Sequence, residues 1–541
     1  MSFKNSISFI CELYSISLNK VRKLYLTSSL YDKKISIIQS KSLIYKPTLS
    51  ILSCLIKYDK TKNKIEDLDL NFFWEKKNLT NKNYKKLHNF FWLFTIDLKS
   101  SNKITQSIIE NWIDKFQKYN PDSWQIDILS KRTISWIANT KITYEGSDNS
   151  YKNKFDKLIN KQINHLIKEI SKSKTVNDKM LGCTAILIVG LSYNNEKFLS
   201  YGLGLLKNII NSSFDSNYFP KSRSIRQLTF YLKYFILIRE LLKESSNEIP
   251  EYLDEIIFYL GKSYYLLLGS EESFLFNGNH VSDLKEFNKY LSLNRYKFKN
   301  DGNEAGGYAL LQNKNSILCM DIGSSPNKKF SENFQSGTLS FEFIYKGEKL
   351  ICNAGYFQDY KNKLNLISKS TAAHSTLIIN NNSSCSFNIM RNKQSFLNNL
   401  IKTSNKNIVY NKDYWIISSS HDGYLKKYGI IHQRTITFYT KDFKILGKDK
   451  LIKKKNFKES TFEIRFHFIP GTKLTKTQDN KTVLIKLNNS GWKFYSDHGS
   501  INIENGLYFG NKNSSNENQN ICISGLNRSV DQEVEWEFIK I

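Results

Sequence analysis

The chain has no cysteine pair at the spacing that a disulfide framework or a thiolate metal site uses. Its seven cysteines are odd in number and well separated, at Cys11, Cys54, Cys183, Cys319, Cys352, Cys385 and Cys522. Disulfide scaffolds are short chains with an even set of cysteines, and thiolate zinc sites use CxxC pairs. The spacing therefore argues against both classes of protein.

Long hydrophobic runs are also missing. The longest apolar run, residues 185–191, is far shorter than the roughly 20 residues that span a bilayer. The apolar patch at the start of the chain is interrupted by Glu12, which makes it a poor hydrophobic region for a signal peptide. From these features we expect a soluble, cytoplasmic protein with no transmembrane segment.

Acidic residues are few beside basic ones, 50 against 79, which gives a formal net charge of +29. Lysine is spread along nearly every segment together with asparagine and isoleucine, a bias that suggests an AT-rich genome. The positive charge either belongs to a solvated lysine-rich surface without a specific role, or it attracts polyanions such as nucleic acid or an acidic polysaccharide. Zinc-finger spacing, a P-loop and a single-strand-binding aromatic signature are all missing, so we expect no nucleic-acid partner.

The length of 541 residues predicts two or three domains, and the first large segment is helical. Apolar residues recur every three or four positions over residues 103–119, 130–139, 154–171, 178–191, 195–210, 224–244 and 250–268. Helix follows helix across short loops, which predicts a bundle, a solenoid or a closed toroid. Residues 1–80 carry no recognisable chemistry, and we expect an N-terminal extension packed on the helical domain.

The pattern changes near residue 295 to short alternating runs separated by turn residues. These runs cover residues 307–312, 316–321, 337–345, 349–353, 407–410, 415–420, 433–439, 443–449, 462–468 and 482–487. Many short strands at regular spacing are typical of an antiparallel β-sandwich. We therefore expect three parts, residues 1–80, 81–295 and 296–541.

The stretch at residues 369–380 is the first candidate site. His374 stands there among small residues, at the start of an apolar strand pattern. Small neighbours leave an imidazole room to meet a ligand, and Lys369, Thr371, Ser375 and Thr376 are polar residues close to it. The alternative is a structural histidine with satisfied hydrogen bonds.

Several motifs of the C-terminal half resemble, in order, the heparinase II/III-like family of polysaccharide lyases. They are Glu304-Ala-Gly-Gly-Tyr308, Asp321-Ile-Gly323, Ser336-Gly-Thr-Leu-Ser-Phe-Glu342, Cys352-Asn-Ala-Gly355, Ser370-Thr-Ala-Ala-His-Ser-Thr376, Ser384-Cys-Ser-Phe387, His421-Asp-Gly-Tyr424, His432-Gln-Arg434, Gly447-Lys-Asp449, Arg465-Phe-His-Phe-Ile-Pro470 and Gly491-Trp492. In the helical half, Trp124, Arg132 and Trp136 are similar to a tryptophan–arginine segment of the same family. The resemblance implies a multidomain α+β protein, an N-terminal incomplete (α/α) toroid followed by a C-terminal antiparallel β-sandwich.

The resemblance also implies β-elimination in a uronate-containing polysaccharide, such as a glycosaminoglycan or an alginate-like glycan. Such an enzyme neutralises the uronate carboxylate, removes the C5 proton and protonates the departing O4. The catalytic residues implied are His374, Tyr424, Asn177 and Arg223, and the substrate-binding residues are Lys369, Lys221, His421 and Arg434. His432 matches a histidine that helps hold a zinc ion in some members, although no cofactor is required. Family members commonly act in the cell envelope, so the resemblance favours the periplasm or envelope over the cytoplasm.

The chain departs from the family pattern in the helical half. Residues 217–220 read Asn-Tyr-Phe-Pro where many members carry an Asp-Gly-Gly-His-like segment, and Asp178 replaces a histidine that often follows the asparagine. The alternative function is therefore a non-catalytic glycan-binding or envelope polysaccharide biogenesis protein on the same scaffold. For single residues the alternatives are a turn-orienting role for His421 and His432, a core position for His467 and a helix cap for Asn177.

Overall fold

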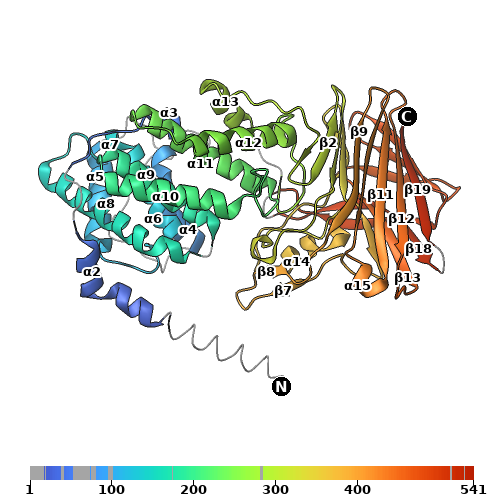
Figure 1. The fold of residues 1–541 in the computed structure, drawn as a ribbon, viewed down its shortest axis with the longest axis horizontal. Helices are drawn as coiled ribbons and strands as arrows, with labels where there is room; N and C mark the ends of the chain where they lie inside the picture. The colour runs from blue at the N-terminus through green and yellow to red at the C-terminus, as the bar shows by residue number, and fades with distance from the viewer. Residues whose placement is uncertain are drawn as a thin grey trace, which may run out of the picture. The chain divides into compact units, whose positions relative to one another are not determined.

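The computed structural model describes residues 18, 20–37, 42–52, 74, 81–95, 102–173, 175–280, 284–511, 514–528 and 531–541. The chain divides into two compact units, Met1–Ser212 with Lys233–Ile257, and Ser213–Leu232 with Phe258–Ile541. The first unit is helical, and the second combines antiparallel sheets with several helices (Figure 1). The prediction of a helical region followed by antiparallel β structure is confirmed. The predicted boundaries at residues 80 and 295 remain predictions.

The helices of the first unit follow one another across short loops. They are α2 (Ser29–Ile35), α3 (Leu49–Leu52), α4 (Asn81–His88), η3 (Phe91–Thr95), α5 (Asn102–Phe116), α6 (Ile126–Ala138), α7 (Thr140–Thr143), α8 (Asn149–Glu169), η4 (Ile170–Lys172), α9 (Val176–Ser192) and α10 (Glu196–Ser213). Two further helices, α11 (Ile225–Glu244) and α12 (Glu251–Leu268), have residues in both units. Among the described helices, none combines the length and the apolar content that a membrane crossing requires.

Helix α9 is the core of the helical unit, because every residue from Met180 to Ser192 is buried. A helix that is apolar on all sides must be covered on all sides. Gly190 shows how closely it is packed, since a methyl group there would lie 2.9 Å from the backbone nitrogen of Leu199 in α10. In the predicted N-terminal extension, α2 contacts α8 through a hydrogen bond of 2.8 Å between the Tyr31 hydroxyl and Nδ1 of His165.

The tryptophan–arginine segment forms part of the same core. The Arg132 guanidinium is fully buried, stacks 4.1 Å from the Trp112 ring, and donates to the carbonyl oxygens of His88 and Ser123, both at 3.0 Å. Both hydrogen bonds come from Nη1 and reach separate segments of the chain, whereas Nε and Nη2 are buried without a hydrogen-bond partner among the described residues. Arg132 therefore fixes the loops at the start of the helical unit.

The described residues of the second unit form four antiparallel sheets. Their strand orders are β1-β2-β3-β4-β5, β14-β15-β16-β19-β12-β11-β10-β9, β17-β18-β13-β6 and β7-β8. The strands are β1 (Glu304–Ala305), β2 (Tyr308–Gln312), β3 (Ser316–Asp321), β4 (Phe341–Tyr345), β5 (Glu348–Ile351), β6 (Leu377–Ile379), β7 (Phe387–Ile389), β8 (Ser395–Leu397), β9 (Thr403–Tyr410), β10 (Tyr414–His421), β11 (Ile430–Tyr439), β12 (Lys444–Lys453), β13 (Ser460–His467), β14 (Lys473–Lys476), β15 (Thr482–Lys486), β16 (Gly491–Tyr495), β17 (Ser500–Tyr508), β18 (Asn516–Asn527) and β19 (Gln532–Lys540). The short helix α13 (Lys285–Leu293) precedes β1, and η5 (Lys328–Phe330), α14 (Lys363–Lys369), η6 (Thr371–Ala373) and α15 (Leu425–Tyr428) lie between strands along the chain.

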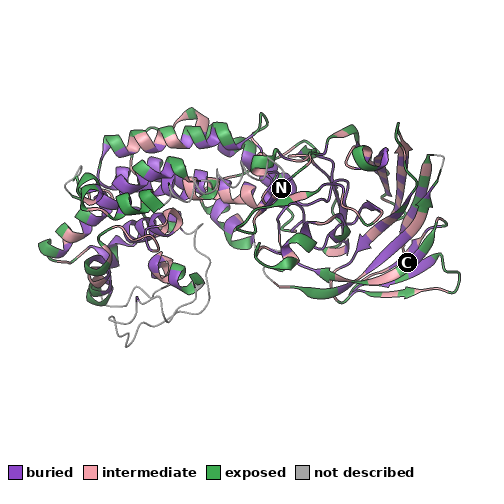
Figure 2. Cartoon of the chain, turned by 90° about the horizontal axis from the view of Figure 1, so that it is seen from below, coloured by how far each residue is buried: buried purple, intermediate pink, exposed green. Residues whose placement is uncertain are grey.

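Burial alternates along the long strands of the second unit, as Figure 2 shows. The buried face of β11 carries Ile430, Ile436 and Phe438, and the same face also carries His432 and Arg434. Because side chains on a strand alternate between two faces, both polar residues point into the sandwich. A buried cation is stable only with hydrogen-bond and ion-pair partners. Arg434 must therefore have polar partners inside the sandwich.

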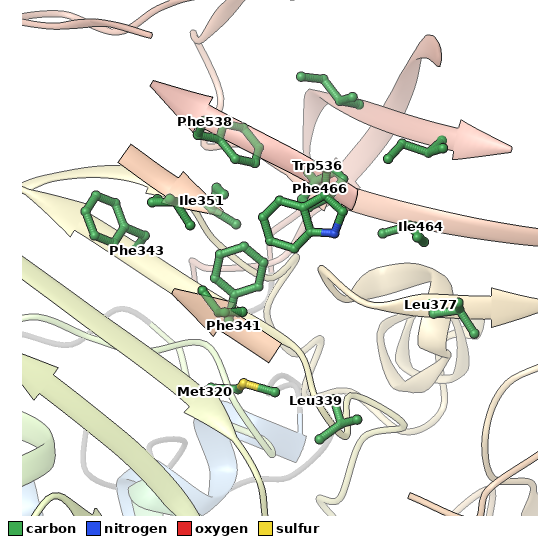
Figure 3. Packing of buried hydrophobic residues seen from close by; sticks show 14 of the residues in the cluster. Met320, Leu339, Phe341, Phe343, Ile351, Leu377, Ile464, Phe466, Trp536 and Phe538 are labelled. Atoms are coloured by element: carbon green, nitrogen blue, oxygen red, sulfur yellow. The ribbon is translucent and has the colours of Figure 1, made fainter. Parts of the chain in front are cut away.

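Aromatic side chains fill the apolar part of this interior (Figure 3). The rings of Phe341 and Trp536 stack with centroids 5.5 Å apart, and the Phe466 ring meets Trp536 edge-on at 4.7 Å. Gly447 makes room for this arrangement, because a methyl group there would overlap the indole of Trp536. The five cysteines within the described residues, Cys183, Cys319, Cys352, Cys385 and Cys522, are buried free thiols, and Cys11 and Cys54 lie outside those residues.

Candidate active site

His374 lies between the short helix η6 and strand β6, and its ring is held in one tautomer. Nδ1 is 2.8 Å from the carbonyl oxygen of Ser370, which is an acceptor, so Nδ1 carries the hydrogen. Nε2 is then the unprotonated nitrogen, and it is buried with no hydrogen-bond partner among the described residues. Burial lowers the pKa of His374 to about 4, so the imidazole is neutral at neutral pH. The ring is therefore a fixed, neutral hydrogen-bond acceptor at Nε2.

Gly337 lies against the His374 ring. A methyl group on Gly337 would be 2.8 Å from Cγ and 2.9 Å from Nε2 of His374. Real Cβ atoms do not approach other heavy atoms this closely. Any residue other than glycine at position 337 would therefore displace the His374 ring. The glycine belongs to the motif at residues 336–342, which the sequence resemblance singled out without a role for this position.

A buried polar group supports the backbone beside His374. Ser375 donates its N–H to Oδ1 of Asn353 at 3.0 Å and its hydroxyl to the carbonyl oxygen of Cys352 at 2.7 Å. Asn353 donates in turn to the fully buried carboxylate of Glu342, which also pairs with Lys349 at 2.7 Å. Asn353 and Glu342 lie in quoted motifs, yet sequence reasoning gave them no role because spacing alone does not show that they meet.

Arg434 supports the same segment from the opposite side. Its Nη1 donates to the carbonyl oxygens of Ser375 at 2.7 Å and Leu339 at 3.0 Å, and its Nε and Nη2 form two bonds with the carboxylate of Asp449. Arg434 and Asp449 are directly opposite on β11 and β12. The Trp536 indole donates to Asp449 as well, at 2.8 Å. Arg434 is completely buried, which suits a positioning role; substrate binding by Arg434 remains a prediction.

His432 and His421 extend this network as a buried chain. His432 Nε2 lies 2.6 Å from Oδ1 of Asp449, its Nδ1 lies 3.3 Å from Nε2 of His421, and the Gly423 N–H donates to Nδ1 of His421 at 3.0 Å. The amide fixes His421 as the Nε2–H tautomer, so His432 accepts at Nδ1 and donates at Nε2. Burial alone would raise the pKa of Asp449, but Arg434 and His432 hold it well below its usual range.

The arrangement around His432 does not fit a zinc site. A metal needs three or four ligands that converge on one point. The two ring nitrogens of His432 point to different partners, Asp449 and His421, and both are occupied. Within the described residues no cluster of three or more histidines, cysteines and carboxylates could hold a metal ion.

Lys369 and Tyr424 also take part in the structure of this region. The Lys369 ammonium is buried and donates to the carbonyl oxygen of Glu332 and to the carbonyl oxygen and hydroxyl of Ser395 at 3.1 and 2.8 Å; burial lowers its pKa to about 8. The Tyr424 hydroxyl donates to the carbonyl oxygen of Leu377 at 2.8 Å, and burial raises its pKa. Tyr424 lies inside the sandwich core, and neither side chain faces open solvent.

Arg223 uses all its polar hydrogens within the protein. Nε donates to Gly306, Nη1 to Gly323 and Ser324, and Nη2 to Gly307 and to Oδ1 of Asp321, at distances of 2.6 to 3.2 Å. A guanidinium has five N–H groups, and these contacts occupy five. A substrate carboxylate would have to displace one of them. The partners lie 83 to 101 positions further along the chain, so sequence spacing does not reveal this saturation.

The remaining predicted residues lie elsewhere. Asn177 is exposed in the first turn of α9, in the helical unit, and Thr175 is the N-cap of that helix, so the interpretation of Asn177 as the cap is wrong. Lys221 is half-buried and follows a bridge between Phe214 and Pro220. The His467 ring donates from Nε2 to the carbonyl oxygen of Ala372 at 2.9 Å, beside the His374 segment.

The buried histidines predict that the protein loses stability in mild acid. Burial lowers the pKa of His374 to about 4, and the pKa values of His467 and His165 to about 3. The pKa of a histidine in the unfolded chain is about 6.5. Below that pH the unfolded chain binds protons and the folded chain does not, so the free energy of unfolding decreases as pH falls towards 4. The melting temperature should be lower at pH 5 than at pH 7. Equal melting temperatures would contradict the burial of neutral histidines.

Comparisons with known proteins agree with this architecture. Residues 301–537 match the family model described as "Heparinase II/III-like, C-terminal". No curated protein matches the chain. Among solved structures, a heparan sulfate lyase HepC mutant from Pedobacter heparinus is similar with a TM-score of 0.67 and 14% identity, covering 92% of this chain and 84% of that one. A heparinase III is similar with a TM-score of 0.65 and 15% identity, covering 93% and 87%.

The structural matches are too distant in sequence to show more than the fold. They extend over the helical region and the sheets together, so the prediction of a toroid followed by a β-sandwich is confirmed. The motifs around His374 lie within the matched residues 301–537. Residues 301–537 therefore form a heparinase II/III-like C-terminal domain, in a chain whose fold is similar to that of the solved heparinase structures.

Proposed function

We propose that the protein is a lyase that cleaves an acidic, uronate-containing polysaccharide by β-elimination. The observation that carries the proposal is the His374 ring, whose tautomer is set by Ser370 and whose Nε2 is an acceptor without a partner among the described residues. The solved relatives include a heparan sulfate lyase, which makes a glycosaminoglycan the first substrate class to test. Such a substrate belongs to the cell envelope or the extracellular space.

In the proposed reaction, His374 acts as the base. Nε2 takes the C5 proton of the uronate, the C5 electron pair forms the C4–C5 double bond, and the C4–O4 bond breaks. O4 leaves with a proton from a second group, and a cation or amide stabilises the carboxylate while negative charge develops. A neutral histidine is the form in which this step begins, and the lowered pKa of His374 keeps the ring neutral before substrate binds.

The proton donor has two candidate tyrosines. Tyr424 is the one that the sequence resemblance predicts, but its hydroxyl is bonded to Leu377 in the core. Tyr356 lies two residues beyond Ala354, whose N–H donates to the carbonyl oxygen of Ala373 at 2.9 Å, next to His374. Burial raises the pKa of Tyr356, whereas Asn365 and the charge of Arg226 act against that rise. The Tyr356 hydroxyl donates to Oδ1 of Asn333 at 3.3 Å, a longer bond than the 2.8 Å bond of Tyr424 to Leu377, so we expect Tyr356→Phe to lower activity more than Tyr424→Phe.

Activity should also depend on Gly337. In Gly337→Ala, the added methyl group displaces the His374 ring, and a misplacement of about 1 Å can cost about a hundredfold in rate. Initial rates of formation of the unsaturated product, measured by ultraviolet absorbance, should fall by at least about tenfold. Gly204→Ala is the matched control, because a methyl group there meets nothing within 4 Å. An unchanged rate in Gly337→Ala would contradict the placement of the base.

The second candidate function is glycan binding without cleavage. It is favoured by the saturated guanidinium of Arg223 and by the buried hydroxyl of Tyr424, because two of the four predicted catalytic residues are held by structural contacts. The Asn177 and Arg223 roles in holding the uronate carboxylate remain proposals. Binding of acidic polysaccharides without any unsaturated product would support this second function.

A further inference from the structure

A pocket of about 550 Å³ lies within the second unit, and its lining includes Arg223 but none of residues 369–380. Three glycines line it: Gly307 and Gly323 pack against the Arg223 guanidinium, and Gly306 packs against the Phe219 ring. A methyl group on Gly323 would lie 2.7 Å from Nε of Arg223, so the glycines allow this close approach. Ligand pockets commonly have volumes of about 300 to 1,000 Å³, so this one has room for a sugar residue.

One wall of the pocket is aromatic. Tyr259, in α12, lines the pocket with 39% of its surface exposed. Its ring stacks on Tyr218 with centroids 4.9 Å apart and an angle of 12°. Tyr218 is held by a tight turn in which it adopts a φ of 57° and Asp215 Oδ1 accepts the N–H groups of Asn217 and Phe219, both at 2.9 Å. The stack therefore presents a supported, flat and partly exposed aromatic surface.

The charges of the pocket favour an anion at one position. Lys406 at the rim is neutralised by Glu304 at 2.7 Å. Asp215 is engaged with backbone N–H groups of its own turn. Lys262 lines the same pocket one turn of α12 beyond Tyr259, and it has no ion-pair partner among the described residues. A cation beside an exposed aromatic ring can recognise a ring that has an apolar C–H face and carries a negative group.

We propose that this pocket is a subsite for one anionic pyranose residue, whose C–H face stacks on Tyr259 and whose carboxylate or sulfate pairs with Lys262. The assignment rests on the proposed function for the class of glycan, but it concerns binding and not the elimination step. The amide of Asn300 lines the pocket and is fixed by the carbonyl oxygen of Lys262 at 3.1 Å and the N–H of Gly302 at 2.7 Å.

The test measures binding of defined tetrasaccharides to the full chain in the His374→Ala background, so that no cleavage occurs. The probes are a heparan sulfate tetrasaccharide, its fully desulfated form, which keeps the carboxylates, and the neutral maltotetraose. Tyr259→Ala and Lys262→Gln should each weaken binding of the charged probes by about tenfold. The matched control is Tyr265→Ala, since Tyr265 is exposed on the same helix and does not line the pocket.

The outcomes separate the subsite from the proposed function. Loss of affinity in Tyr259→Ala but not in Tyr265→Ala supports the subsite. Equal affinity for the sulfated and desulfated heparan sulfate probes indicates that Lys262 pairs with a carboxylate. Unchanged affinity in Tyr259→Ala, equal losses in both tyrosine variants, or no binding of the charged probes overturns it. With an active protein, Tyr259→Ala should raise KM and leave kcat nearly unchanged. Failure of elimination alone, with binding intact, contradicts the proposed function and leaves the subsite standing.

Discussion

His374→Ala should abolish measurable formation of unsaturated product. A positioned general base contributes about a hundredfold to ten-thousandfold in rate, so kcat should fall by at least about a hundredfold. The reason is the loss of the buried Nε2 acceptor of the ring that the Ser370 carbonyl holds in place. The measurement is the initial rate of the increase in ultraviolet absorbance with a panel of heparan sulfate, hyaluronan and alginate.

The matched control for this substitution is His498→Ala. The His498 side chain is 39% exposed and pairs with Asp497 in a loop before β17. Its removal should leave the rate unchanged. His374→Asn is a second variant, because a smaller polar side chain leaves less empty space if His374→Ala proves unstable. Full activity in both His374 variants, with the fold intact, would exclude His374 as the base.

Asp449→Asn should produce the largest loss of stability. The carboxylate of Asp449 is fully buried and neutralises Arg434 through two hydrogen bonds while accepting from His432 and Trp536. Breaking a buried ion pair by removing one partner costs about 3 to 5 kcal/mol, because the remaining charge stays buried without compensation. Chemical denaturation should therefore show a much lower unfolding midpoint for this variant.

The control for Asp449 is an exposed pair of the same type. Asp413 pairs with Lys441 at 2.8 Å, with side chains 55% and 75% exposed. Surface pairs of this kind contribute little, so Asp413→Asn should leave the midpoint unchanged. If Asp449→Asn were as stable as the control, the buried network would not hold the sandwich interior together. Because Arg434 binds the Ser375 carbonyl, we also expect reduced activity in the surviving folded protein.

Much of the fold follows from periodicity in the sequence. The predicted helix over residues 178–191 corresponds to α9 (Val176–Ser192), and the alternating run at residues 433–439 lies within β11 (Ile430–Tyr439). Periodicity does not distinguish a bundle from a toroid, since both use the same amphipathic helices. The prediction of a toroid came from the resemblance of the C-terminal motifs to the heparinase II/III-like family. In β11 it also indicated that His432 and Arg434 belong to one motif, although not that both face the core.

The site is less predictable than the fold because its contacts join distant segments. His374 is recognisable from its small neighbours, but the restriction that Gly337 places on its ring depends on packing between separate loops. The commitment of Arg223 to Asp321 and to three glycine carbonyls likewise depends on tertiary structure. Sequence therefore predicts candidate residues for the site, and the structure distinguishes a free acceptor from a saturated donor among them.

We infer that His374 is the base of an elimination reaction. The most direct measurement is the ultraviolet absorbance of the unsaturated uronate during incubation of the protein and of His374→Ala with heparan sulfate, hyaluronan and alginate. We expect the absorbance to rise with at least one polysaccharide for the unmodified chain, and we expect no rise for His374→Ala. No rise with any of them, while the unmodified chain still binds the polysaccharide, would contradict the lyase and leave a glycan-binding protein.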